Sequence, residues 1–190
     1  LVLQNEPDLI QALYRSLTHR EGFHAFLEKL TNAIKGCAAQ LLVINRHPLR
    51  MEHLWYHGLS EEFTTWYLEN NMIAQDVVTN QTVKQTPGLF QSALPLLPDF
   101  QPDEDYSKWE NEQDMLDSAW LLVDNTRTHS FVLTIQRTVA QGPYQQAELD
   151  ALNRLVPHIR QTVQLYRQLE TRNQAASSLA AIIDVLPDAT

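Results

Sequence analysis

Apolar positions recur along this chain with the spacings of helices and of strands. Residues 6–17 carry apolar side chains on one helical face, after a proline and carboxylates typical of a helix start. A second helical pattern covers residues 22–36, where Gly36 is placed to end the helix. The almost wholly apolar run 38–45 predicts a strand covered on both faces, and residues 51–57 predict the strand that pairs with it.

The middle of the chain predicts a helix, an irregular segment and a second hairpin. Ser60, before two glutamates, predicts the N-cap of a helix that ends near residue 71. Residues 86–117 are rich in proline and acidic side chains and predict turns and a solvated loop. The apolar runs 118–124 and 130–137 then predict two paired strands.

A long helical pattern begins at Tyr144 and runs to about Asn173. Pro157 lies inside it and predicts a kink, because proline has no N–H to donate and its ring clashes with the preceding turn. A second seam, offset from the first, continues the pattern: Leu165, Leu169, Arg172, Ala176, Leu179, Ile183 and Leu186. We expect the helix to project from the body and to pair with its copy in a homodimer. The predicted dimer interface consists of Leu149, Leu152, Val156, Ile159, Val163, Tyr166 and Leu169.

The order of these elements indicates the fold class. Two helices, two strands, a helix, an irregular segment, two strands and a long helix favour an α/β chain of the α+β type. Its antiparallel sheet, flanked by helices, resembles GAF and PAS sensory domains. We expect a sensor domain over residues 1–143, a dimerisation and signalling helix over 144–186, and the start of a truncated following domain at 187–190.

The net charge of −9 argues against nucleic-acid binding by these residues, because that affinity comes largely from Lys and Arg. We therefore expect contact with nucleic acid only through a part of the polypeptide that is missing here. The single Cys37 has no internal disulfide partner, and no run of about 18 apolar residues is present to span a membrane. These features predict a cytoplasmic protein without a membrane partner, and Leu1 in place of an initiator Met indicates a fragment.

Several segments together carry a family resemblance. They are Asp76, Tyr106, Trp109, the run Asp117–Val123, Phe131–Leu133, Gly142–Pro143–Tyr144 and the run RLVPHIRQTVQLYRQL at 154–169. In order and type they resemble the N-terminal sensor region of bacterial LuxR-type helix-turn-helix transcription regulators, over about residues 20 to 190. The resemblance implies a GAF-like ligand-sensing module, then a PAS-like segment opening with words such as DVLPDAT, and a C-terminal DNA-binding domain.

Within this resemblance, Phe63, Tyr67 and Asp76 have the spacing of three residues of acyl-homoserine-lactone receptors. The resemblance implies that Asp76 accepts a hydrogen bond from a ligand amide and that the aromatic residues line the pocket. The family has a tryptophan, whose indole N–H holds the lactone carbonyl, where this chain has Phe63, and phenylalanine has no donor. In the alternative interpretation, Phe63 and Tyr67 pack on the sheet while Asp76 caps a turn.

Aromatic side chains from several elements are candidates to line one small-molecule cavity, because such sites are mostly apolar with a few placed polar groups. We expect an unidentified small-molecule signal as the ligand. The predicted ligand-binding residues are Trp55, Phe63, Trp66, Tyr67, Asp76, Trp109 and Trp120. Core packing is the alternative for the aromatic residues, above all for Trp120 and Phe131.

The sequence predicts no catalytic site, no cofactor and no metal site. No nucleophile–base motif or phosphate-binding glycine loop is visible, and the 5 glycines are scattered. His53 and His57 share a strand face but lie about 13 Å apart by strand rise, too far to share an ion. We therefore interpret the chain as a ligand sensor rather than an enzyme. The alternatives are a dimerisation module without a small-molecule ligand, and an enzyme on the same fold.

Overall fold

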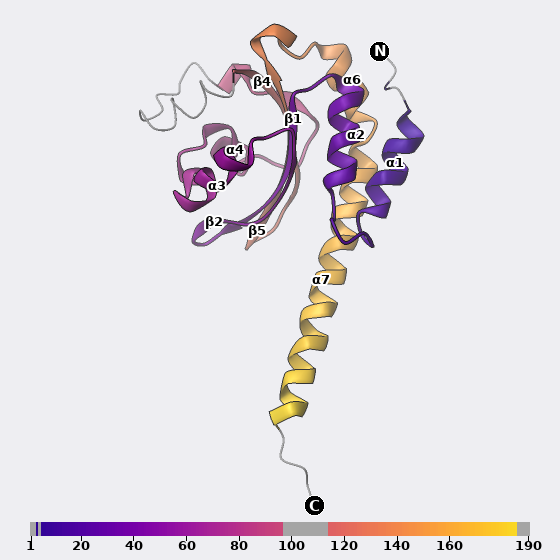
Figure 1. Cartoon of the computed structure of the whole chain (residues 1–190), viewed down its shortest axis with the longest axis vertical. Coiled ribbons are helices and arrows are strands. Elements are labelled where there is room, and N and C mark those ends of the chain that lie inside the picture. Colours follow the sequence, from indigo (N-terminus) through magenta and orange to yellow (C-terminus); the bar gives the residue numbers. More distant parts are fainter. Residues whose placement is uncertain (1–2, 4, 97–113, 186–190) are drawn as a thin grey trace, which may run out of the picture.

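A five-stranded antiparallel sheet separates two layers of helices in the computed structural model of this chain (Figure 1). The structure describes residue 3 and residues 5–96 and 114–185. The strand order is β2-β1-β5-β4-β3. The strands are β1 (Ala38–Arg46), β2 (Leu49–His57), β3 (Gln91–Ser92), β4 (Met115–Asn125) and β5 (His129–Thr138). The predicted α+β, GAF-like architecture with two hairpins and a long C-terminal helix is confirmed; the short strand β3 was not predicted.

The central strands carry apolar side chains on both faces because both faces of the sheet are covered. β1 pairs with β2 on one side and with β5 on the other, and Val43 lies opposite Phe131. The ladder shifts register between Val43 and Ile44 and again between Leu122 and Asp124. Irregularities of this kind bend strands, and both lie at the level of Phe131, in a sheet that is visibly curved (Figure 1).

The larger core lies between the sheet and a layer of four helices. These are α1 (Glu6–Arg15), α2 (His24–Ile34), α6 (Gln146–Asn153) and the first part of α7 (Val156–Val185) (Figure 1). Phe23, Phe26 and Leu27 are almost completely buried in this layer. Lys35, rather than Gly36, takes the left-handed conformation that ends α2. Gly36 instead allows a close approach to β5, since a Cβ there would lie 2.9 Å from the Ile135 side chain.

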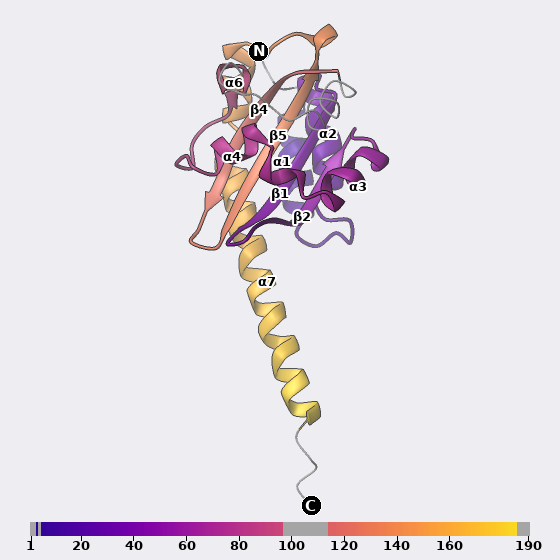
Figure 2. The ribbon, with the colours of Figure 1, turned by 90° about the vertical axis from the view of Figure 1, so that its left-hand side faces the viewer.

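The opposite face of the sheet carries a thinner layer of short elements. It contains α3 (Glu61–Glu69), η1 (Met72–Ala74) and α4 (Val77–Thr82), which lie in front of the sheet in Figure 2. Ser60 occupies the predicted N-cap of α3, but its side chain makes no capping hydrogen bond. The remaining short helices are η2 (Leu94–Leu96) and η3 (Val139–Gln141).

Pro157 marks a break between two helices rather than a kink within one. α6 ends at Asn153 and α7 begins at Val156, so Pro157 lies in the first turn of α7. The missing N–H of proline costs no helical hydrogen bond at that place. The prediction that Pro157 kinks one continuous helix is therefore wrong: the helical pattern is divided before the proline, between Asn153 and Val156.

The first apolar seam of this helical region packs inside its own chain. Five members of the predicted dimer interface are at most 7% exposed in a single chain: Leu149, Leu152, Val156, Ile159 and Val163. The prediction of a dimer interface at these five positions is corrected by this packing, because the sheet and the neighbouring helices already cover them. Tyr166 is partly buried against the same core, and Leu169 is exposed.

The second part of α7 projects away from the globular body (Figures 1 and 2). The helix has 30 residues, and every residue from Thr171 to Ser178 is exposed. Leu165 and Leu169, at the start of the predicted offset seam, are 36% and 40% exposed. The described residues contain no helix that is both long and apolar enough to span a bilayer.

Candidate functional site

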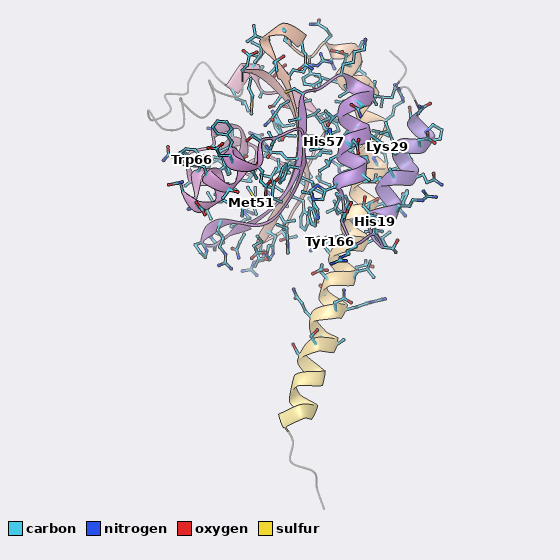
Figure 3. All side chains as sticks on the ribbon, in the orientation of Figure 1. His19, Lys29, Met51, His57, Trp66 and Tyr166 are labelled. Carbon is cyan, nitrogen blue, oxygen red and sulfur yellow. The ribbon has the colours of Figure 1, made fainter. Side chains whose placement is uncertain are left out.

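A smaller apolar cluster fills the space between the sheet and the α3–α4 layer. Tyr67 of α3 and Trp120 of β4 are buried in it, and Phe63 and Trp66 of α3 pack against it. Figure 3 shows Trp66 on this side of the sheet, opposite the layer that contains α2 and α7. The structure therefore brings together four of the residues predicted to bind a ligand. Leu42, Ile44, Leu122 and Val132 supply the sheet side of the cluster.

Tyr67 and Asp76 are in direct contact within this layer. The Tyr67 hydroxyl donates a hydrogen bond of 2.8 Å to Oδ2 of Asp76. The Asp76 carboxylate also accepts from the backbone N–H and the hydroxyl of Thr79, both at 2.9 Å, and so caps α4. Asn80 closes the same turn by donating to the carbonyl oxygens of Ile73 and Asp76, each at 2.8 Å. Asp76 is 7% exposed, so its charge is held in place by these donors.

Three buried polar atoms on this face of the sheet have no hydrogen-bond partner among the described residues. They are Trp120 Nε1, Thr134 Oγ1 and Gln136 Oε1. Trp120 and Thr134 are cross-strand partners in β4 and β5, and Gln136 follows Thr134 by two positions, so the three side chains share one face. The indole donates, the amide oxygen accepts, and the hydroxyl does both. A buried polar atom without a partner costs about 1–3 kcal/mol. A bound molecule that formed hydrogen bonds with these three atoms would therefore stabilise the folded protein.

Trp55 does not belong to this cluster, and its prediction as a ligand residue beside Trp120 is wrong. Adjacent strand residues point to opposite faces, so Leu54 faces the α3–α4 layer while Trp55 faces the helix layer. There the Trp55 ring contacts Phe23 and Tyr166 edge-on, with centroids 5.0 and 5.4 Å away. Trp109, the remaining predicted ligand residue, lies outside the described residues.

Sequence reasoning missed Thr134 and Gln136 as candidate site residues. The available signal was their position inside the largely apolar run 130–137, which is predicted to form a strand. Thr134 is 3% exposed and Gln136 4% exposed. A polar side chain at such a place either forms a hydrogen bond within the protein or lacks a partner there, and only the structure distinguishes the two cases.

Other buried charges have partners that explain them structurally. Asp117 accepts from the Ser92 hydroxyl at 2.9 Å, the Ala93 N–H at 3.1 Å and the Tyr144 N–H at 2.9 Å. These bonds tie β3, β4 and the start of α6 together. The described residues hold no group of three or more His, Cys, Asp or Glu side chains arranged to bind a metal.

The curved antiparallel sheet with a thick helix layer on one face and a thin one on the other defines a class of protein. It is the GAF-like fold, shared with solved GAF domains and with solved structures of LuxR-family transcription factors. No family model matches the sequence, and no curated protein matches it either.

Particular solved structures with this fold come from several bacteria. The N-acylhomoserine-lactone-dependent LuxR-family transcription factor CepR2 of Burkholderia cenocepacia is 13% identical, with a TM-score of 0.63 over 84% of this chain and 94% of that chain. The LBD domain of VqsR from Pseudomonas aeruginosa is 14% identical, with a TM-score of 0.60 over 85% and 93%. The GAF domain of a phosphoenolpyruvate-protein phosphotransferase from Coxiella burnetii is 12% identical, with a TM-score of 0.58 over 89% and 98%.

Proposed function

We propose that this chain is the ligand-sensing and dimerising region of a bacterial LuxR-type transcription regulator. It binds a small, mostly apolar signal molecule between the sheet and the α3–α4 layer. It forms a homodimer through α7 and passes the signal to a DNA-binding domain outside this chain. Its place of action is the cytoplasm, and its role is binding without catalysis.

The observation that carries the ligand proposal is the row of polar atoms on the α3–α4 face of β4 and β5. Trp120 Nε1, Thr134 Oγ1 and Gln136 Oε1 lie on the face of the sheet that carries the smaller apolar cluster, and no described residue satisfies them. A ligand with an apolar body and a short polar group matches this pattern, because ligand sites combine apolar walls with a few placed donors and acceptors. A purely structural layer gains nothing from three unsatisfied atoms.

Trp120 can supply the hydrogen-bond donor that Phe63 lacks. CepR2 depends on an N-acylhomoserine lactone. Phe63 has no donor to offer a carbonyl group, but the indole N–H of Trp120 is buried in the same cluster and lacks a partner among the described residues. We therefore propose that a carbonyl-bearing signal is held by Trp120 rather than by the α3 position.

The dimer proposal rests on the outer flank of α7. Higher on this flank, Tyr14 of α1 covers His158, with a hydroxyl-to-Nδ1 distance of 3.2 Å. Leu165 follows His158 by seven residues, two turns further along the same flank, and Leu165 and Leu169 are 36% and 40% exposed in the single chain. An uncovered helix is only marginally stable in water, so a second copy packed on these leucines would stabilise the projecting segment.

Native mass spectrometry and thermal shift measurements test the ligand proposal. We expect a small molecule to co-purify, or a compound from a broad panel of acylated signals to raise Tm. Trp120→Phe removes the indole donor, so it should abolish the ligand-linked shift. Tyr144→Phe is the matched control, because it removes another buried polar atom for which the described residues provide no hydrogen-bond partner, on the opposite face of the sheet.

The same measurements separate the alternative, a dimerisation module without a ligand. In that case no compound co-purifies, no compound raises Tm, and the protein is still dimeric by light scattering. Equal ligand-linked shifts in wild type and Trp120→Phe would instead reject the placement of the site.

A further inference from the structure

A groove of about 530 Å³ lies where α7 leaves the globular body. It is on the face of the sheet that α1, α2, α6 and the first part of α7 cover. Three parts of the chain form it: the end of the β1–β2 hairpin, the end of the β4–β5 hairpin, and α7 between Tyr166 and Gln174. Its volume is in the range of small-molecule sites. The α3–α4 layer and Trp120 lie on the other face of the sheet, so this groove is separate from the site proposed above.

The floor of the groove is aromatic. Phe131 and Tyr166 contact each other edge-on, with centroids 6.5 Å apart, and both line the groove together with Val43. His53 forms part of the wall and stacks on Trp55 at an interplanar angle of 19°. Burial and the nearby Glu170 raise the pKa of Tyr166 to about 12, so its hydroxyl stays neutral at physiological pH. A flat ring placed here would meet ring edges and faces, the geometry that aromatic pairs favour.

The charged groups around the groove are partly engaged by one another. Arg167 forms an ion pair with Asp124. Glu52 accepts from His129 at 2.8 Å and from Asn45 at 2.9 Å. Arg127 and Glu170 also line the groove, and neither has an ion pair among the described residues. Within the described part of the chain, Arg127 on the β4–β5 turn and Glu170 on α7 are therefore the groove charges without an ion pair.

We propose that this groove binds a small zwitterion with an aromatic ring, of the class of aromatic α-amino acids. The ligand carboxylate pairs with Arg127, its ammonium group pairs with Glu170, and its ring lies on Phe131 and Tyr166. Tyr166 and Arg167 attach α7 to the sheet just before the exposed segment Thr171–Ser178 begins. A ligand at this attachment point affects the direction in which α7 leaves the body whenever its affinity differs between two helix positions. The inference does not depend on the function proposed above.

A titration with L-tryptophan and two analogues tests the proposal on the whole chain. Tryptamine lacks the carboxylate, and indole-3-propionate lacks the ammonium group. In two-dimensional NMR we expect L-tryptophan to shift the amide signals of Thr128, His129 and Arg167. Each analogue should bind about three- to ten-fold more weakly, because each loses one charged hydrogen bond at a partly exposed site.

Two variants assign the charges. Arg127→Gln should lower the affinity for L-tryptophan to that for tryptamine and leave the affinity for tryptamine unchanged. Glu170→Gln should lower the affinity for L-tryptophan to that for indole-3-propionate and leave the affinity for indole-3-propionate unchanged. Trp120→Phe, on the opposite face, should leave every affinity unchanged. The proposal is overturned if no groove amide responds, if the three compounds bind equally well, or if Trp120→Phe is the variant that removes binding. Thermal unfolding of each variant confirms that it is folded.

Discussion

Trp120 and Thr134 face each other directly across β4 and β5, and each presents a buried polar atom without a partner among the described residues. This arrangement predicts an unusual response to Thr134→Val. Replacing an unsatisfied hydroxyl by a methyl group of similar shape removes a desolvation cost, so the free energy of unfolding of the ligand-free protein should stay unchanged or rise by about 1 kcal/mol. Urea denaturation of ligand-free protein measures this change.

Thr31→Val provides the comparison for that experiment. The Thr31 hydroxyl is equally buried but donates to the carbonyl oxygen of Leu27 at 2.7 Å. Loss of a made hydrogen bond should lower the free energy of unfolding by about 1 kcal/mol. Equal losses in the two variants would mean that Thr134 is satisfied in solution, and the proposed ligand site would lose its main support.

The second prediction concerns Asp76 and the stability of the α3–α4 layer. Asp76→Ala removes the N-cap of α4 and leaves the Tyr67 hydroxyl and the Thr79 N–H without this acceptor. The loss should amount to about 2 kcal/mol in the free energy of unfolding. Asp76→Asn, which keeps an acceptor oxygen, should lose less. Hydrogen exchange should show the largest change at residues 76–83; exchange that is unchanged there would contradict a capping role.

A third prediction concerns Arg137 and Glu148, which form a nearly buried ion pair with Nη2 and Oε1 2.7 Å apart. Arg137 also donates to the Ile34 carbonyl oxygen and lies over the Tyr144 ring, 4.1 Å from its centroid. The hydrogen bonds from Arg137 lower the pKa of Glu148 below its usual 4.5. The folded protein therefore binds the Glu148 proton less well than the unfolded chain, so the pair stabilises the fold above about pH 4.5 and loses this contribution as the pH falls.

Glu148→Gln tests this pH dependence. At pH 7 the variant should be less stable by about 1–3 kcal/mol, because Arg137 stays buried with a weaker partner. The difference from wild type should shrink as the pH is lowered from 5 to 3 in urea denaturation. A difference that is constant over this range would show that the Glu148 charge contributes nothing to stability.

The sequence predicted which aromatic residues gather beside the α3–α4 layer better than it predicted the elements that hold them. The alternative interpretation of Asp76, as the cap of a turn, is confirmed by its N-cap bond to the Thr79 N–H, whereas its role as acceptor for a ligand amide stays a prediction. The helix that it caps was not predicted. α4 has only 6 residues, VVTNQT, and all of them except Gln81 are β-branched or Asn and poor in helix propensity. Tertiary packing and the cap override these preferences.

Periodicity located the faces of β2 and α7 but did not say what covers them. The alternation along β2 placed Trp55 on a face, yet only the packing of α2 and α7 shows that this face is not the one that Trp120 occupies. In the same way, apolar residues that alternate at spacings of three and four along a helix are equally compatible with a coiled coil and with a domain core. The chain uses the seam through Val156 and Ile159 for its own core.

The last prediction follows from that assignment and concerns the offset seam of α7. If Leu165 and Leu169 form the dimer contact, replacing both by Glu places charges on an interface that must be apolar, and light scattering should then report a monomer. Leu89→Glu is the matched control, because Leu89 is 55% exposed and lies outside α7, so the dimer should persist. Val163→Ala distinguishes the two seams, because Val163 is 1% exposed inside the chain. This variant should lower the free energy of unfolding by about 1–3 kcal/mol. The dissociation constant of the folded dimer should stay unchanged. A wild-type chain that remains monomeric at millimolar concentration would reject the dimer contact and leave the projecting part of α7 to another partner.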